Sequence, residues 1–136
     1  MNFKTWLENE DYRGTHKAPD GETGAPLHDL TNIYPDDIYG PNGARYYGHG
    51  DPIDNFTISV IQAAKNKPSM PVKIYRAVPA NVNKINFGDW VTINRQYAIM
   101  HGESWLHGKY RILSKTVPAK TLYTEGNSIH EWGYNP

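Results

Sequence analysis

The chain has 136 residues, a length that suits one domain with its own hydrophobic core. Its fourteen basic and fourteen acidic residues give zero formal net charge, so extended nucleic-acid binding through phosphate contacts is not expected. Cysteine is absent, which excludes disulfides, thiolate metal ligands and a cysteine nucleophile. No stretch approaches the length of a membrane span, and the N-terminus lacks the apolar core of a signal peptide. We therefore expect a cytoplasmic protein that does not bind membranes.

The first 51 residues predict a short helix followed by a long irregular segment. Phe3, Trp6 and Leu7 recur at helical spacing, which predicts a helix over residues 1–12. Residues 13–51 are dense in Gly, Pro and Asp, yet they hold more apolar side chains than a solvated linker would: Leu27, Leu30, Ile33, Tyr34, Ile38 and Tyr39. We expect this segment to wrap over the core, and it is a candidate for lining a functional site.

A second helix is predicted to begin at Asp51. Asp51 suits the N-cap, Pro52 suits the first helical position, and Asp54 places negative charge in the first turn. Pro68 ends the helix. Its apolar residues recur at helical spacing and predict one buried face, made of Ile53, Phe56, Val60, Ala63 and Ala64.

The C-terminal half predicts mostly strands. Alternating apolar residues and β-branched runs predict strands over residues 72–79, 89–93, 110–117, 121–124 and 129–134. Asn94 is a candidate cap for one intervening helix over residues 95–105, with Tyr97 and Trp105 on one side. Helices thus precede most of the strands, an order that predicts an α+β fold.

Three polar residues interrupt the inward faces of three different predicted strands. Arg76 shares the face of the apolar residues of its strand, Thr92 shares the face of Trp90, and Glu131 is in phase with Ile129. A guanidinium on an inward face costs several kcal/mol, as an order of magnitude, unless an anion pairs with it. That anion is either a carboxylate of this protein or a ligand. Because buried polar groups need partners, the three residues are predicted to meet at one site.

The segments that carry these residues are Ile74-Tyr-Arg-Ala, Trp90-Val-Thr-Ile-Asn and His130-Glu-Trp. Together they resemble the Arg–Ser/Thr–Glu arrangement of the ADP-ribosyltransferase superfamily, and their order and spacing fit a small member. The chain from residue 25 onward also resembles a small stand-alone family found in bacteriophage and other mobile-element proteins. The resemblance implies one domain over residues 1–136, with split, mixed β-sheets that form a cleft for NAD and a helical, loop-rich N-terminal half.

The resemblance also implies a role for each polar residue. Arg76 would hold a phosphate or the nicotinamide ribose of NAD, and Thr92 would orient Glu131. Glu131 would stabilise the oxocarbenium-like cation that forms as nicotinamide leaves, and no metal is required. The residues implied in NAD binding are Tyr75, Arg76, Ala77, Trp90, Thr92, Asn94 and Tyr97.

The sequence departs from the family pattern on the side of the acceptor. Arginine-directed members carry a glutamate two residues before the catalytic glutamate, and here that position is Ile129. Transfer to arginine is therefore not expected, and Glu125 and His130 are the remaining candidates for activating an acceptor. Ile93 and Asn94 also replace the family's usual threonine and serine. We expect a protein acceptor, such as a component of a host or rival defence system.

Two other classes of function remain open from the sequence. One is an ADP-ribosyltransferase-like binding or inhibitor module that has lost catalysis. The other is a metal-dependent hydrolase that uses the pairs His28–Asp29 and His49–Asp51, although neither pair has a recognised zinc spacing.

Overall fold

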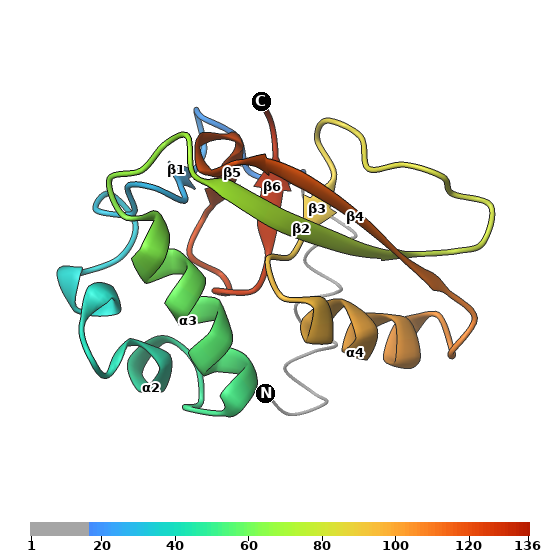
Figure 1. Cartoon of the computed structure of the whole chain (residues 1–136), viewed down its shortest axis with the longest axis horizontal. Coiled ribbons are helices and arrows are strands. Elements are labelled where there is room, and N and C mark those ends of the chain that lie inside the picture. Colours follow the sequence, from blue (N-terminus) through green and yellow to red (C-terminus); the bar gives the residue numbers. More distant parts are fainter. Residues whose placement is uncertain (1–16) are drawn as a thin grey trace.

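The computed structural model describes residues 17–136 (Figure 1). The helix predicted over residues 1–12 lies outside the described residues. The described chain is an α+β fold with two separate antiparallel sheets and the helices α2, α3 and α4. In Figure 1, α4 lies beneath the long β2–β4 ribbon, and α3 lies towards the other end of the molecule.

The segment predicted to be irregular does wrap over the core. It contains the two-residue strand β1 (Ala25–Pro26), the 3-10 helix η1 (Asp36–Tyr39) and the short helix α2 (Gly43–Tyr47). Between and within these elements Leu27, Leu30 and Ile38 are fully buried. Burial of these side chains explains why a segment with little regular structure is nevertheless so apolar.

Helix α3 (Pro52–Ala64) has the predicted start, but it buries a different face. Its buried residues are Asp54, Thr57, Ile58, Ile61 and Ala64. Of the predicted stripe, Ala64 is buried and Val60 is partly buried against the core, whereas Phe56 is 53% exposed. The helix turns Asp54 and Thr57 inward because both side chains hydrogen-bond to His130. Polar groups can be buried when they are hydrogen-bonded, and a hydrophobicity pattern alone does not reveal which polar groups will find partners.

The strands of the described residues form two sheets, which are joined through the backbone by an isolated bridge. β2 (Pro71–Val78) pairs along its whole length with β4 (Arg111–Pro118). The second sheet has the order β1-β5-β6-β3, in which β5 is Leu122–Thr124, β6 is Trp132–Tyr134 and β3 is Trp90–Val91. The 3-10 helix η2 (Ala119–Thr121) leads from β4 into β5. A single antiparallel bridge between Tyr75 and Thr92 joins the two sheets.

Two details of the predicted sheets are corrected. The sheets were expected to be mixed, but every strand pairing among residues 17–136 is antiparallel. The last strand was expected to begin at Ile129, but β6 begins at Trp132. Ile129 and His130 form a turn in which the His130 N–H donates to Ser128 Oγ at 3.1 Å, so Glu131 precedes the strand.

Helix α4 (Arg95–Trp105) has the predicted bounds and the predicted cap. The Asn94 side chain accepts the backbone N–H groups of Gln96 and Tyr97, at 3.0 and 3.4 Å. These bonds satisfy donors that the first turn of a helix leaves without intrahelical partners. The cap therefore fixes where α4 starts and how Tyr97 is presented to the sheet.

One hydrophobic cluster joins the two halves of the described chain, and it includes Leu27, Ile61, Ile74 and Trp132. Within residues 17–136, none of the helices combines the length and the apolar character that crossing a membrane requires.

Candidate functional site

A small cavity lies where β2, the end of β3 and the first half of α4 come together. Its lining contains the three residues predicted to be catalytic, namely Arg76, Thr92 and Glu131. The other predicted NAD-binding residues in the lining are Tyr75, Ala77, Trp90 and Tyr97. Side chains from three segments that are distant in sequence are thus brought to one place.

The strand register explains why these residues meet. Tyr75 and Thr92 exchange two backbone hydrogen bonds, of 2.8 and 3.0 Å, which sets Arg76 beside the end of β3. β3 pairs with β6 so that Val91 faces Trp132. Continuing that antiparallel register by one residue puts Thr92 opposite Glu131. Hydrogen bonding between strands, rather than any local motif, assembles the site.

Arg76 has partners on this protein. Its Nη1 donates a 2.8 Å hydrogen bond to the carbonyl oxygen of Trp90, and its Nε lies 3.9 Å from Asp89 Oδ2. The side chain of Arg76 is 30% exposed. A charge pair this long and this open to solvent contributes about 1 kcal/mol or less. The contacts therefore direct the guanidinium along β3 and beside the cavity more than they neutralise it.

Glu131 is a buried carboxylate whose side chain is held by Tyr97. It is 4% exposed, and the Tyr97 hydroxyl donates a 2.9 Å hydrogen bond to its Oε1. The ring of Tyr97 in turn stacks on the imidazole of His130, with centroids 4.7 Å apart and an interplanar angle of 18°. The orientation of Glu131 thus depends on α4 as well as on the turn before β6.

Asn94 was predicted to bind NAD; its side chain has partners on this protein, and the residue also lines a hollow of about 430 Å³ that shares Tyr75 with the cavity. Besides capping α4, its Nδ2 donates to the carbonyl of Ile53 at 2.9 Å and to Thr57 Oγ1 at 3.0 Å. Asn94 is only 3% exposed and is not part of the cavity lining. It ties α4 to α3.

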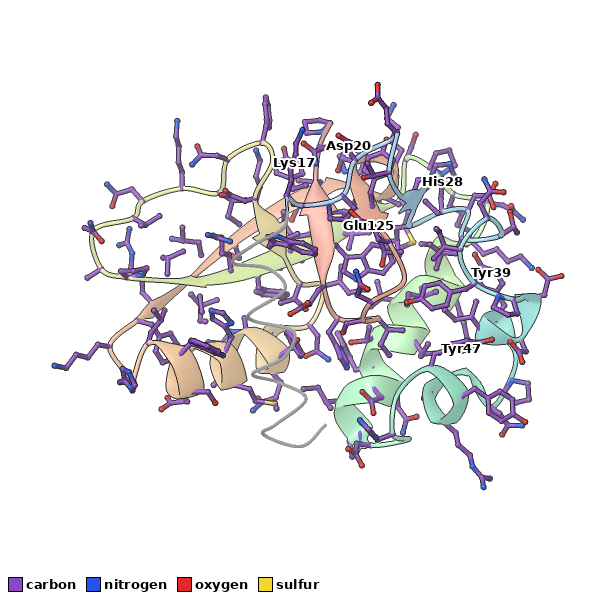
Figure 2. All side chains as sticks on the ribbon, turned by 180° about the vertical axis from the view of Figure 1, so that it is seen from behind. Lys17, Asp20, His28, Tyr39, Tyr47 and Glu125 are labelled. Atoms are coloured by element: carbon purple, nitrogen blue, oxygen red, sulfur yellow. The ribbon has the colours of Figure 1, made fainter. Side chains whose placement is uncertain are left out.

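The two predicted acceptor-side residues also lie outside the cavity lining. His130 is buried between Asp54 and Thr57, with Nε2 2.7 Å from Asp54 Oδ1 and Nδ1 2.9 Å from Thr57 Oγ1. Glu125 is half-buried and follows directly after β5, where Figure 2 labels it in the view from behind. The surroundings of His130 suit a residue that holds elements together, and an acceptor-side role for Glu125 or His130 stays a prediction.

The Asp54 carboxylate is stabilised in its charged form. Burial raises the pKa of Asp54, but the hydrogen bond from His130, the backbone N–H groups of His49 and Asp51, and the charge of His130 outweigh it and bring the pKa to about 2. The His49 N–H lies 2.7 Å from Asp54 Oδ2, so both carboxylate oxygens have partners. The Asp54 carboxylate is therefore buried in its charged form with both oxygens hydrogen-bonded.

Two residues of this region were not predicted as functional. His101 lines the cavity from α4, one helical turn after Tyr97, and that i, i+4 spacing was the available signal. Asp54 was predicted only as a charge in the first helical turn. Its partner His130 is 76 residues away, and no local pattern connects them.

The space at the site is small. The cavity has a volume of about 10 Å³, which is room for roughly one water molecule. Two wider hollows of about 300 and 430 Å³ lie next to it, and Tyr75 lines all three.

Across the described part of the chain, no three histidine or acidic side chains converge as metal ligands would. Comparisons with known protein families, with curated proteins and with solved structures found no match to this chain.

Proposed function

We propose that this protein is a mono-ADP-ribosyltransferase that cleaves NAD at the nicotinamide–ribose bond and transfers ADP-ribose to a protein acceptor. The observation that carries the proposal is the convergence of Arg76, Thr92 and Glu131 on one cavity. The sequence segments that hold them resemble the ADP-ribosyltransferase superfamily, and the proposal combines that resemblance with the geometry.

In the proposed reaction the bond between nicotinamide and the ribose breaks, and nicotinamide leaves with the bonding electron pair. The ribose carbon becomes cationic as this happens, and the Glu131 carboxylate stabilises the cation. An acceptor nucleophile then forms a bond to that carbon and releases a proton. The products are nicotinamide and an ADP-ribosylated acceptor.

The other lining residues supply binding and orientation. Arg76 offers a planar, permanently charged donor group that suits a phosphate or a ribose hydroxyl. Thr92 contributes a hydroxyl that is 5% exposed and whose oxygen already accepts the Asn94 N–H at 3.2 Å. Tyr75, Trp90 and Tyr97 supply aromatic surface against which a nicotinamide ring can stack.

The volume of the cavity sets a condition on this proposal. Pockets that bind small molecules have volumes of about 300–1,000 Å³, far more than the cavity offers. NAD binding therefore requires the lining to move apart. Tyr75 lines the cavity and both wider hollows, so we propose that movement of its side chain opens the space that NAD needs.

The proposal is tested by incubating the purified protein with NAD in the presence of a chelator and measuring released nicotinamide by chromatography. Glu131→Gln is the test variant, and Glu22→Gln, which changes an exposed glutamate, is the matched control. We expect release by the parent and by the control but not by Glu131→Gln. Equal release by all three, or release that the chelator abolishes, would refute the proposal. Intact-mass spectrometry of candidate partner proteins then identifies the acceptor.

A second candidate function is an ADP-ribosyltransferase-like module that acts by contact alone. The small cavity volume and the contacts of Arg76 with Trp90 and Asp89 favour it. This candidate is supported if the folded parent neither releases nicotinamide nor binds NAD in a calorimetric titration, while it still binds a partner protein.

A further inference from the structure

Behind the cavity, a buried chain of hydrogen bonds connects α4, α3 and the turn before β6. Asn94 Nδ2 donates to Thr57 Oγ1 at 3.0 Å, Thr57 Oγ1 lies 2.9 Å from His130 Nδ1, and His130 Nε2 lies 2.7 Å from Asp54 Oδ1. All four residues are at most 4% exposed. A polar chain this deep in a protein is costly unless each member is satisfied.

In this series of hydrogen bonds each residue can donate to the next, from Asn94 through Thr57 and His130 to Asp54. With a ring proton on Nε2, His130 donates to Asp54, and an Nδ1 without a proton accepts a hydrogen bond from the Thr57 hydroxyl. The Thr57 oxygen is then open to accept the Asn94 amide proton. Each of these donors and acceptors then has a partner, and the two partners of the imidazole fix the ring plane of His130.

The ring plane of His130 bears on the carboxylate of Glu131 by two routes. His130 stacks on Tyr97, whose hydroxyl holds Glu131 Oε1, and His130 directly precedes Glu131 in the turn. Tyr97 is also held at its backbone N–H by the Asn94 side chain. Fixing the imidazole therefore fixes both the hydroxyl that holds the carboxylate and the backbone that carries it.

The geometry points to Asp54 and His130 as positioning residues for Glu131, acting through Tyr97. This inference rests on the proposed function, because it is the role of Glu131 in NAD cleavage that makes its orientation matter. A catalytic group has to be held within about 0.5 Å of its productive position by the residues behind it. A buried hydrogen-bonded pair adds little to stability on balance, since apolar residues of similar volume can stabilise as well.

The inference is tested kinetically with Asp54→Asn and Tyr97→Phe, two substitutions that keep the shape of the side chain. Asp36→Asn and Tyr46→Phe, at exposed positions, are the matched controls. We expect each test variant to lower kcat for nicotinamide release about tenfold or more, with KM for NAD within about twofold of the parent. Because both act through one carboxylate, the double variant should lose no more than the worse single variant.

A purely structural role predicts a different result. The variants would then melt at lower temperature while the folded protein keeps the parental kcat. Substitutions that act on kcat independently would instead give a double variant whose loss is the product of the two single losses. Either finding would overturn the inference. If Asp54→Asn fails to fold, His130→Gln replaces it, because it removes the ring that stacks on Tyr97 while retaining a polar side chain.

A measurement that needs no activity separates this inference from the proposed function. The side-chain carboxyl carbon of Glu131 is followed by carbon-13 NMR, and its signal is assigned as the one missing from Glu131→Gln. We expect Asp54→Asn and Tyr97→Phe to shift that signal, and the two controls to leave it in place. A parent that cleaves no NAD refutes the proposed function, whereas an unmoved Glu131 signal refutes the positioning role.

Discussion

Tyr97 and Glu131 are 34 residues apart in the sequence, and the Tyr97 hydroxyl donates a 2.9 Å hydrogen bond to Oε1 of Glu131. The hydroxyl belongs to the first turn of α4, and the carboxylate belongs to the turn before β6. Both side chains are buried, so water does not compete strongly for the contact. This one hydrogen bond connects the helix to the second sheet at the cavity, and the predictions for catalysis depend on it.

Replacing Glu131 with glutamine should lower turnover while it leaves NAD affinity nearly unchanged. The amide keeps the size of the side chain, but it cannot stabilise a cation that exists only in the transition state. We expect kcat for nicotinamide release to fall about a hundredfold or more. Rapid-quench kinetics and calorimetric titration of NAD measure the two quantities separately. Near-parental turnover would show that Glu131 is not the catalytic carboxylate.

Arg76→Ala should produce the opposite pattern, namely weaker NAD binding. Loss of charge-assisted hydrogen bonds should cost roughly 1.5–3 kcal/mol of binding free energy. Calorimetric titration measures this, with circular dichroism as the check on folding. Arg45→Ala, at an exposed position of α2, is the matched control. An unchanged affinity in a folded Arg76→Ala protein means that Arg76 only supports Trp90 and Asp89.

The corrected orientation of α3 can be tested by two substitutions on opposite faces. Ile61 is fully buried, so Ile61→Ala should lower the free energy of unfolding by about 2–5 kcal/mol. Phe56 is 53% exposed, and Phe56→Ala should change the free energy of unfolding by about 0.5 kcal/mol or less. Urea denaturation followed by tryptophan fluorescence compares the two. A larger loss for Phe56→Ala would restore the face that the sequence predicted.

The Asp54 carboxylate should make stability fall in acid. Its pKa is about 2 in the folded protein against 3.8 ordinarily, so its contribution is complete above about pH 4 and is lost as the pH falls towards 2. We expect the parent to lose about 1–2 kcal/mol more than Asp54→Asn over that range. Urea unfolding at several pH values measures the difference. If the free energies of unfolding of the two proteins fall equally as the pH is lowered, the stabilising role of the charged Asp54 side chain is contradicted.

The acceptor should carry ADP-ribose on a residue other than arginine. Ile129 occupies the position from which arginine-directed relatives of the proposed family present a carboxylate, and here its side chain is 2% exposed within the hydrophobic cluster. An isoleucine can neither pair with a guanidinium nor take its proton. Hydroxylamine lability, followed by site mapping with electron-transfer fragmentation, identifies the modified residue. An adduct on arginine, or on nucleic acid, would contradict the conclusion that Ile129 rules out transfer to arginine.

Several features of this protein follow from its sequence because their causes are local. Alternation of apolar residues predicted β2, and the capping side chain of Asn94 predicted the start of α4. The polar residues Arg76, Thr92 and Glu131 stood out because each interrupts an apolar pattern, and all three line the cavity. These signals lie within a few residues of the feature that they specify.

The tertiary structure decided the features whose causes are distant along the chain. Asp54 and His130 are 76 residues apart, and their pairing turns Asp54 and Thr57 inward on the same face of α3 as Ile58 and Ile61. The same pairing holds His130 in the core, outside the lining of the cavity. A buried hydrogen bond between distant segments offsets the cost of burying both partners, and neither segment alone contains that information.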